Sequence, residues 1–182
     1  KRAGAMVVSQ PRRGFGRACL AAIECLRMIM PDVVVFMDGS ETFYPEDIPR
    51  LIAPIIKAQY DLVIGSRIKG EIEQGSLSKP QIYGTLLATR LIDYLFKVNY
   101  TDFGTFRAIR YDRLMGLGLR DLEAGFGMEM QLKAAKKGLR ITEVPVRYQK
   151  RLGTPKVTGT LFGATNASLN VISVIANHIF MN

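Results

Sequence analysis

The sequence contains few of the residues that build several common kinds of functional site. Its single histidine, His178, lies near the carboxyl end of the chain, which excludes a histidine-based catalytic triad and a multi-histidine zinc site. The two cysteines, Cys19 and Cys25, fall on different faces of one predicted helix, which argues against a disulfide. We therefore expect two reduced core cysteines, as is usual in a reducing compartment.

The chain also lacks long apolar segments. No uninterrupted apolar run reaches the roughly 18 residues that a membrane-spanning helix requires. At the amino terminus, Lys1 and Arg2 precede a short strand-like segment at residues 5–8, without the apolar core and small-residue cleavage site of a signal peptide. These two absences predict a cytoplasmic location.

Acidic residues are outnumbered. The chain has 25 lysines and arginines against 16 aspartates and glutamates, a net charge of +9 and a sequence pI near 9.8. Such a balance attracts nucleic acid, an anionic membrane face or a phosphorylated substrate. We expect phosphates and no nucleic acid, because several cations follow predicted strands and no nucleic-acid-binding motif or aromatic stacking platform is visible. The basic groups concentrate at Arg12, Arg13 and Arg17, at Arg67, and at Arg147, Lys150, Arg151 and Lys156.

What the chain does contain is the composition of one compact domain. With 182 residues, 48% of them hydrophobic and 23% charged, it can bury a core without disulfides or metal. We find no repeat, low-complexity tract or linker, and predict a single domain over residues 1–182. Residues 161–182 are apolar but interrupted by polar side chains, which predicts a carboxyl-terminal surface helix that docks on the core, a partner or a membrane interface. Core docking is the favoured alternative.

Two apolar runs each end in polar residues. Residues 33–37 stop at Asp38, and residues 62–64 stop shortly before Arg67. Continuous β-branched runs are typical of strands covered on both faces, and ligands of open α/β sheets bind beyond the carboxyl ends of such strands. One strand therefore delivers a carboxylate and the other a cation. The segment between them begins with Pro45 and has apolar residues at helical spacing, which predicts a helix.

The remaining elements follow from periodicity and turn residues. We predict helices at residues 17–30 and around Leu87 and Glu129, a loop at residues 69–81, and strands at 105–109 and 141–146. The last strand alternates apolar and polar residues, which is typical of a sheet edge. For the helix around Leu87, the residues expected to face inward are Leu87, Leu91, Tyr94 and Leu95.

Several blocks of sequence carry a family resemblance. They are FMDGS at 36–40, YPEDIP at 44–49, DLVIGSR at 61–67, TDFGTFRAIR at 101–110, EMQLKAA at 129–135, GLR at 138–140 and EVPVRY at 143–148. Together they resemble the family-two nucleotide-sugar glycosyltransferases, which include the polyprenyl- and dolichyl-phosphate sugar synthases. The resemblance implies an α/β fold of the nucleotide-diphospho-sugar transferase (GT-A) type, with a mixed, mostly parallel sheet flanked by helices.

The resemblance also implies that the beginning of the domain is absent. The Pro-x-x-Asn-Glu and Asp-Asp-Gly-Ser segments that hold the nucleotide in the family do not occur upstream of Val33. We therefore expect the later two-thirds of a catalytic domain, lacking its first strand-helix units. The strand edge left open in this way favours association, so a homo-oligomer is one expectation.

The activity implied by the resemblance is inverting transfer of a sugar from a nucleoside-diphosphate sugar to a polyprenyl or dolichyl phosphate, at the cytoplasmic face of a membrane. Two alternatives remain open. One is transfer to a sugar hydroxyl, which would need Asp102 or Glu129 as a base. The other is a non-catalytic binding module that has lost the usual chemistry.

Asp38 is the principal candidate metal ligand. A departing nucleoside diphosphate accumulates negative charge, and a hard cation held by carboxylates can balance it. The family's second aspartate is replaced here by Ser40, and Glu41 stands where the family has glycine. We therefore expect weak binding of Mg²⁺ or Mn²⁺, with Ser40 and Glu41 as uncertain additional ligands. The competing explanation is that Asp38 only caps the turn after its strand.

Arg67 and Arg107 are the candidate catalytic cations. In the lipid-phosphate members of the family the corresponding arginines face the acceptor phosphate, which the guanidinium fork can bind through two hydrogen bonds. The alternative is that both form structural ion pairs with Asp61 or Asp102.

The resemblance extends the expected substrate-binding set beyond these residues. A phosphate acceptor has a second pKa near ~6 and needs no base, so Asp102 and Glu129 would orient other groups, with Glu129 on the acceptor side. The segment from Arg147 to Lys156 resembles a basic loop that closes over the donor pyrophosphate. The full set of expected substrate-binding residues is Ser66, Asp102, Glu129, Arg147, Arg151 and Lys156.

Overall fold

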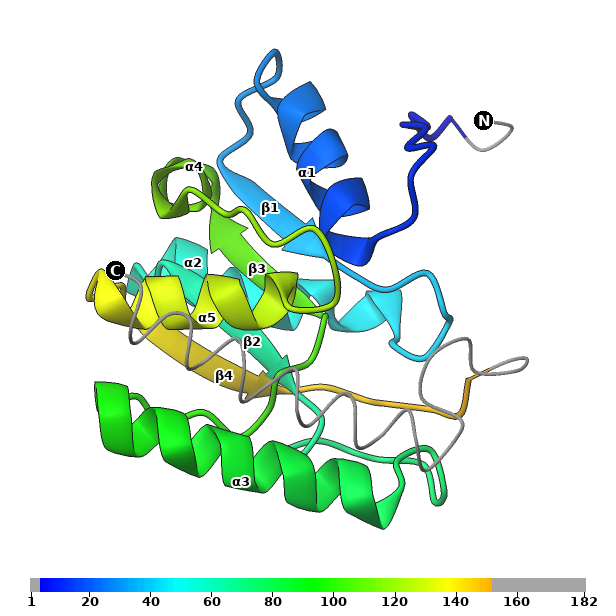
Figure 1. The fold of residues 1–182 in the computed structure, drawn as a ribbon, viewed down its shortest axis with the longest axis vertical. Coiled ribbons are helices and arrows are strands. Elements are labelled where there is room, and N and C mark those ends of the chain that lie inside the picture. The colour runs from blue at the N-terminus through cyan, green and yellow to red at the C-terminus, as the bar shows by residue number, and fades with distance from the viewer. Residues whose placement is uncertain (1–3, 152–182) are drawn as a thin grey trace.

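A computed structural model describes residues 4–151 of the chain (Figure 1). Its helices and strands, in chain order, are α1 (Phe15–Leu26), β1 (Val33–Phe36), the 3-10 helix η1 (Pro45–Asp47), α2 (Ile48–Ala58), β2 (Leu62–Ser66), α3 (Lys79–Phe96), β3 (Arg107–Arg110), α4 (Tyr111–Leu117), α5 (Phe126–Lys136) and β4 (Ile141–Pro145). The predicted helix at 161–182 lies outside the described residues.

The four strands form one mixed sheet in the order β1-β3-β2-β4. Strand β3 runs antiparallel to both β1 and β2, whereas β4 runs parallel to β2. It follows that β1, β2 and β4 share one direction and that only β3 is reversed. The predicted mixed sheet is confirmed, although two of its three strand pairings are antiparallel. The last strand lies at an edge, as its alternating pattern indicates.

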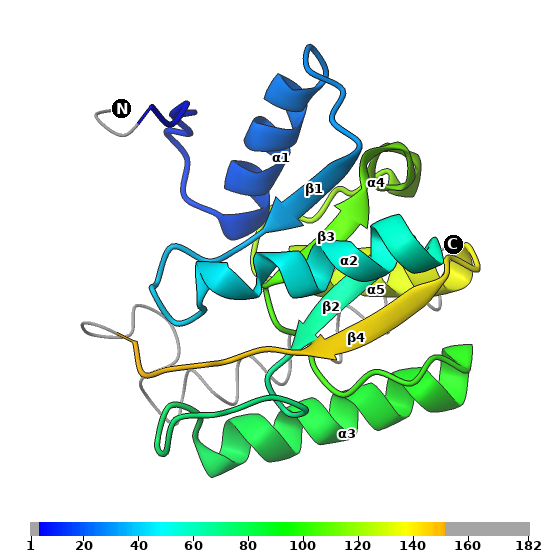
Figure 2. The same cartoon turned by 180° about the vertical axis from the view of Figure 1, so that it is seen from behind.

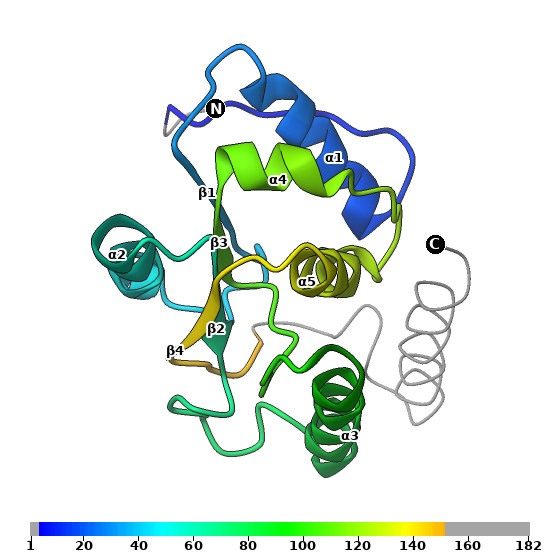
Figure 3. The ribbon, with the colours of Figure 1, turned by 90° about the vertical axis from the view of Figure 1, so that its left-hand side faces the viewer.

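Helices cover both faces of the sheet (Figure 3). On one face, Val63 and Ala108 pack with Leu51 and Ile55 of α2. On the other face lie α1, α4 and α5, with apolar residues of β2 such as Ile64 in the same cluster. Because successive residues of a strand point to opposite faces, a strand covered on both sides must be apolar throughout. All five residues of β2 are buried, as the continuous apolar run predicts.

Two sequence-based expectations near the amino end are wrong. Residues 5–8 form no strand, and Met6 is 74% exposed. The first helix begins at Phe15 and ends at Leu26, whereas the sequence predicts a helix over residues 17–30. Met30 instead adopts a positive φ of 46°, and it precedes Pro31, whose ring disfavours helical conformation in the residue before it.

Helix α3 faces the opposite way from the prediction. The residues expected to point inward are exposed, with Leu87 at 71% and Tyr94 at 75%, whereas Ala88, Thr89 and Ile92 are buried. The helix has apolar residues on both sides, so periodicity alone cannot select the buried one. Packing beside α5 and Tyr100 buries the Ile92 side.

A capping box starts the helix: the Ser78 hydroxyl accepts from the Gln81 amide, and the Gln81 side chain accepts from the Ser78 amide.

The chain segments that follow β2 and β4 touch at Gly70. The amide of Gly70 donates to the carbonyl of Arg67 at 3.0 Å, and the amide of Val146 donates to the carbonyl of Ser66 at 3.2 Å. A Cβ atom built on Gly70 would overlap the backbone carbonyl oxygen of Val146. Only glycine lets the two backbones approach this closely.

We therefore expect Gly70→Ala to lower the free energy of unfolding by about 1–3 kcal/mol, the usual cost of forcing an extra carbon into a filled space. Urea denaturation of parent and variant measures the difference. The matched control is Gly116→Ala in α4, where an added Cβ meets no atom within 4 Å and the change should be neutral or stabilising. Equal unfolding free energies for the parent and Gly70→Ala would contradict the close approach.

Candidate active site

Three chain segments converge at the carboxyl ends of the parallel strands. The segment after β4 runs between the segment after β1 and the segment after β2 (Figure 2). Tyr148 forms isolated bridges with Phe43 on one side and Ile72 on the other. The amide of Gln149 donates to the carbonyl of Thr42 at 2.9 Å, which ties the same segments together. This edge of the sheet carries most of the residues predicted to be functional.

Asp38 lies at this edge, in a pocket of about 240 Å³. One carboxylate oxygen, Oδ1, accepts from the amide of Ser40 at 3.0 Å, and the Ser40 hydroxyl lies 3.0 Å from the Thr42 hydroxyl. Asp38 thus caps its turn and also lines the pocket. The residues lining the pocket are Met37, Asp38, Gly39, Glu41, Phe43, Tyr44, Pro45, Glu46 and Gln149.

The donor chemistry of this pocket suits a hard cation that takes most of its ligands from a substrate. Asp38 has a second carboxylate oxygen, and Glu41 contributes another carboxylate to the lining. Ser40 is engaged with its neighbours in the turn, as its two hydrogen bonds show. Within residues 4–151, no three histidine, cysteine or carboxylate side chains are grouped so that they could hold a metal by themselves.

Arg67 is locked to Asp102 by three hydrogen bonds. Its backbone amide and Nε donate to Oδ2 of Asp102, each at 2.8 Å, and Nη2 donates to Oδ1 at 2.6 Å. The Asp102 side chain is fully buried, and the Arg67 guanidinium also stacks 5.1 Å from the ring centre of Tyr148. The ion pair considered as an alternative for Arg67 is therefore present, and it holds the guanidinium plane in one orientation at the edge of the site.

A second polar network lies directly beside this pair. The hydroxyl of Ser66 is 2.7 Å from that of Thr101, and Thr101 donates to Glu143 through its amide and its hydroxyl, both at 2.7 Å. Lys69 completes the network with an ion pair from Nζ to Glu143 at 2.9 Å, while 46% of its side chain stays exposed. Sequence reasoning did not select Lys69 or Glu143, because nothing local links positions so far apart.

Arg147 is held by a second buried carboxylate that the sequence analysis did not select. Its amide donates to Asp47 Oδ2 at 2.9 Å, and NH2 donates to Oδ1 at 2.9 Å. Burial acts to raise the pKa of Asp47, but the hydrogen bonds and charge of Arg147 outweigh it and lower that pKa. Arg151, four residues further along the chain, is exposed. Lys156 lies outside the part of the chain that the structure describes.

Arg107 lies in the interior, bonded to backbone carbonyls. It is 2% exposed, and its guanidinium donates to the backbone carbonyls of Gly127, Phe103 and Gly104. Burial lowers the pKa of Arg107 to about 10, which leaves the group charged at neutral pH. A guanidinium committed to carbonyls in the interior supports the fold, and the expectation that Arg107 also faces an acceptor phosphate stays a prediction.

Glu129 is also buried and bonded to its surroundings. Its carboxylate accepts from the amides of Arg120 and Asp121 and pairs with Lys133 at 2.7 Å, so it anchors the segment between α4 and α5. Its expected place on the acceptor side stays a prediction. Burial acts to raise the pKa of Glu129, but the hydrogen bonds from Lys133, Asp121 and Arg120 prevail and lower it.

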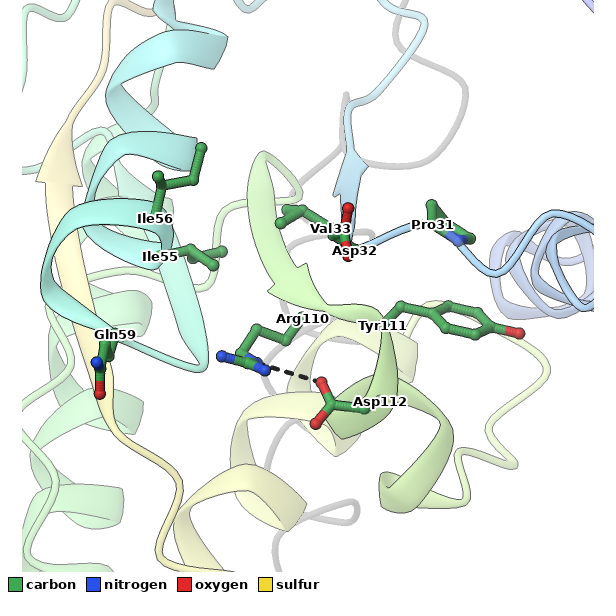
Figure 4. Close-up of a pocket in the computed structure, with 9 residues that line it drawn as sticks. All are labelled: Pro31, Asp32, Val33, Ile55, Ile56, Gln59, Arg110, Tyr111 and Asp112. Carbon is green, nitrogen blue, oxygen red and sulfur yellow. Dashed lines mark hydrogen bonds and ion pairs between the residues drawn. The ribbon is translucent and has the colours of Figure 1, made fainter.

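A larger pocket, of about 690 Å³, lies at the other end of the sheet (Figure 4). Its lining includes Asp32 and Val33 at the start of β1, and Arg110, whose Nε donates to Asp112 at 3.2 Å. None of the predicted functional residues lines it. Its size alone does not make it the active site, because it lacks the convergent polar loops described above.

The sequence profile described as Glycosyl transferase family 2 matches residues 2–117. The chain belongs to this family. An uncharacterised glycosyltransferase of Mycobacterium tuberculosis is 32% identical over 178 residues, which are 96% of this chain and 78% of the relative. The dolichyl-phosphate hexose transferase of Haloferax volcanii is 30% identical over 90% of this chain and 69% of its own. The undecaprenyl-phosphate mannosyltransferase of Micrococcus luteus is 35% identical over 72% and 56%.

Solved structures place this family 2 chain in the GT-A fold. Glucosyl-3-phosphoglycerate synthase of Mycobacterium tuberculosis, crystallised with Mn²⁺, uridine diphosphate and glucosyl-3-phosphoglycerate, superposes with a TM-score of 0.68 at 19% identity. The match covers 93% of this chain and 56% of the synthase, so the chain spans little more than half of that enzyme. The fold and the enzyme class, glycosyltransferase, agree with the sequence analysis. Within residues 4–151, no helix is long and apolar enough to cross a membrane.

The lowered pKa of Glu129 predicts a pH-dependent contribution to stability. A carboxylate whose pKa is lowered by folding stabilises the native state above its ordinary pKa of 4.5, and this stabilisation is lost as the pH falls through the lowered value. We expect Glu129→Gln to reduce the free energy of unfolding at pH 7 by about 1.5–3 kcal/mol and to flatten its decline in acid.

Urea denaturation at several pH values between neutrality and pH ~3.5 measures both effects. The control is Glu24→Gln on α1, since Glu24 forms only an exposed ion pair with Arg27 and should change stability by less than about 1 kcal/mol. Parallel pH curves for the parent and Glu129→Gln would contradict the assigned role.

Proposed function

We propose that this chain forms the metal, pyrophosphate and acceptor parts of an inverting glycosyltransferase that moves a sugar from a nucleoside-diphosphate sugar to a polyprenyl or dolichyl phosphate. One observation carries the proposal: a carboxylate-lined pocket and several cations meet at the same edge of the sheet. Asp38 lines the pocket, and Arg67, Lys69 and Arg147 follow β2 and β4. Two relatives, named as transferases for dolichyl phosphate and undecaprenyl phosphate, support the acceptor class.

The donor side is proposed to lie around Asp38. With Asp38 and Glu41 as protein ligands, Mg²⁺ or Mn²⁺ would neutralise the charge that develops on the departing diphosphate. Solved relatives of this fold contain Mn²⁺ together with uridine diphosphate, which supports the class of cation. The basic segment from Arg147 onward would contact the pyrophosphate, and Asp47 would fix the position at which that segment leaves the sheet.

The acceptor side is proposed to lie around Lys69 and Arg67. Asp102 orients the Arg67 guanidinium, while the half-exposed ammonium of Lys69 can turn from Glu143 toward a phosphate oxygen. In the reaction, a phosphate oxygen of the acceptor forms a bond to the anomeric carbon from the side opposite the leaving group. The bond between that carbon and the diphosphate oxygen breaks, and the nucleoside diphosphate departs with the electron pair.

The surroundings of the two candidate bases favour a phosphate acceptor over a sugar hydroxyl. A hydroxyl nucleophile must lose its proton to a nearby base, whereas a phosphate monoester is largely dianionic at neutral pH, its second pKa being near ~6. Asp102 is fully buried and accepts hydrogen bonds from Arg67 and Phe103. Glu129 holds the segment before α5. Neither carboxylate is placed to take a proton from an incoming hydroxyl.

A lipid phosphate is carried by a membrane, so the proposal puts the reaction at a membrane surface. The cytoplasmic face is the expected side, on the sequence grounds given above. The single domain over residues 1–182, the carboxyl-terminal helix and self-association remain predictions.

Asp38→Asn should lower the rate of sugar transfer at least about a hundredfold, since it removes the charged ligand that positions the cation at the leaving group. The measurement is transfer of labelled sugar from uridine- and guanosine-diphosphate sugars to undecaprenyl phosphate, at a series of Mn²⁺ concentrations. Asp32→Asn is the control, because Asp32 precedes the same strand at its opposite end. Unchanged transfer by Asp38→Asn would refute the donor assignment.

Lys69→Gln should raise the KM for the lipid phosphate about tenfold and leave the KM for the donor unchanged, because one charge-assisted hydrogen bond to the acceptor is lost. Thermal stability should change little, since the Lys69 side chain is 46% exposed and the buried Glu143 carboxylate keeps its two hydrogen bonds from Thr101. The matched control is Lys57→Gln, because Lys57 is an exposed lysine in the last turn of α2. A larger effect on the donor KM than on the acceptor KM would move Lys69 to the donor side.

A further inference from the structure

The outward face of α3 is a continuous apolar stripe. Its members recur at intervals of three and four residues and so share one side of an 18-residue helix. Three of them are more than two-thirds exposed, and none of the described elements covers the stripe. Its residues are Tyr83, Leu87, Leu91, Tyr94 and Leu95. Isolated exposed apolar residues are ordinary, but a row of this length on one helix indicates an interaction surface.

Cations form a row along one border of this stripe. Lys79, Arg90 and Lys97 are all exposed, and their separations are close to whole numbers of helical turns, so they lie on one line. The ammonium of Lys97 lies 5.3 Å from the ring centre of Tyr94, at the boundary between the two rows. Asp93 is the only acidic residue of the helix. The surface that would complement this face is therefore apolar in depth and anionic at its border.

A lipid bilayer with anionic headgroups has this layered arrangement. A helix that lies in the plane of such a surface buries an apolar face at the acyl boundary and directs lysine and arginine toward the phosphates. Tyrosine is favoured at the same depth, because its ring is apolar and its hydroxyl reaches water. The two tyrosines of the stripe, Tyr83 and Tyr94, are both largely exposed and suit this environment.

Helix α3 is also connected at both ends to the proposed acceptor site. It follows the segment that carries Arg67 and Lys69, and the chain after it returns to Asp102, which holds Arg67. The helix forms an outer edge of the molecule and packs beside α5 (Figures 1 and 3). A membrane in contact with α3 would thus lie next to the cations proposed to bind a lipid phosphate.

We propose that the outward face of α3 is a docking surface for an anionic lipid bilayer. The proposal extends the proposed function, because it supplies the way in which the acceptor cations reach the headgroup layer. It can nevertheless be tested without donor, acceptor lipid or catalysis, so its failure and that of the transfer reaction are separate results.

The test is flotation of the 182-residue protein with vesicles of phosphatidylcholine, with and without phosphatidylglycerol. The parent should float with the anionic vesicles and bind the neutral ones more weakly. The double variant Leu87→Asp, Tyr94→Asp should reduce the ratio of bound to free protein at least about tenfold, because charges at the centre of the stripe cannot enter the acyl boundary. Arg90→Gln should weaken binding to the anionic vesicles alone.

The matched control is Ile56→Asp on α2, since Ile56 is also an apolar side chain that is 70% exposed but lies on the other face of the sheet. It should bind vesicles as the parent does. Circular dichroism and thermal melting verify that each variant is folded. We expect all of them to fold, because the altered side chains are exposed and make few core contacts.

Three outcomes would overturn the proposal. The parent could fail to float with anionic vesicles, or the double variant could bind as well as the parent. Alternatively, sedimentation analysis could show that the double variant changes self-association while vesicle binding is unaltered, which would make the face a contact between copies of this chain.

Discussion

The buried ion pair between Arg67 and Asp102 is the interaction on which the candidate active site depends. A fully buried carboxylate is costly unless it is paired and hydrogen-bonded, and Asp102 accepts from the amide and guanidinium of Arg67 and from the amide of Phe103. These bonds join the end of β2 to the turn before β3. Because Ser66 and Thr101, the neighbours of the pair in sequence, also bond to each other, the networks of Lys69 and Glu143 are built on the same junction.

The turn held by Asp102 is supported from its other side by Arg107. The guanidinium of Arg107 crosses from β3 to the carbonyl of Gly127 in α5 and also bonds carbonyls of the turn itself. A Cβ on Gly127 would lie 2.8 Å from Nη2 of Arg107, so a larger residue at position 127 would displace the guanidinium. One arginine thus fixes the turn to the helix layer, and the other fixes it to the neighbouring strand.

The sequence predicts those features that depend on local pattern or on short matched blocks. The continuous apolar runs identify β1 and β2, and the family blocks indicate the fold. The polar residues that follow the runs lie at the edge of the sheet that carries the candidate site. The errors arise where the orientation or the partner of a residue is set by parts of the chain that are distant in sequence. The inward face of α3 is selected by its contact with α5 and Tyr100, and the partners of Glu129 lie in a loop whose path is set by packing. The pairs Arg147–Asp47 and Lys69–Glu143 join positions about 100 and 74 apart, for which no local pattern exists.

The reversed direction of β3 has a consequence for how the chain can vary. Because β3 is antiparallel to β2, the chain leaves the sheet and returns to it at the same edge. The connection between the two strands, residues 69–100, is closed at its base by the Ser66–Thr101 hydrogen bond and the Arg67–Asp102 ion pair. Lengthening a closed connection costs little conformational entropy and leaves the register of the strands unchanged. This part of the molecule is therefore an exchangeable module: its length and outer face can diverge between relatives while the base that carries the cations keeps its geometry.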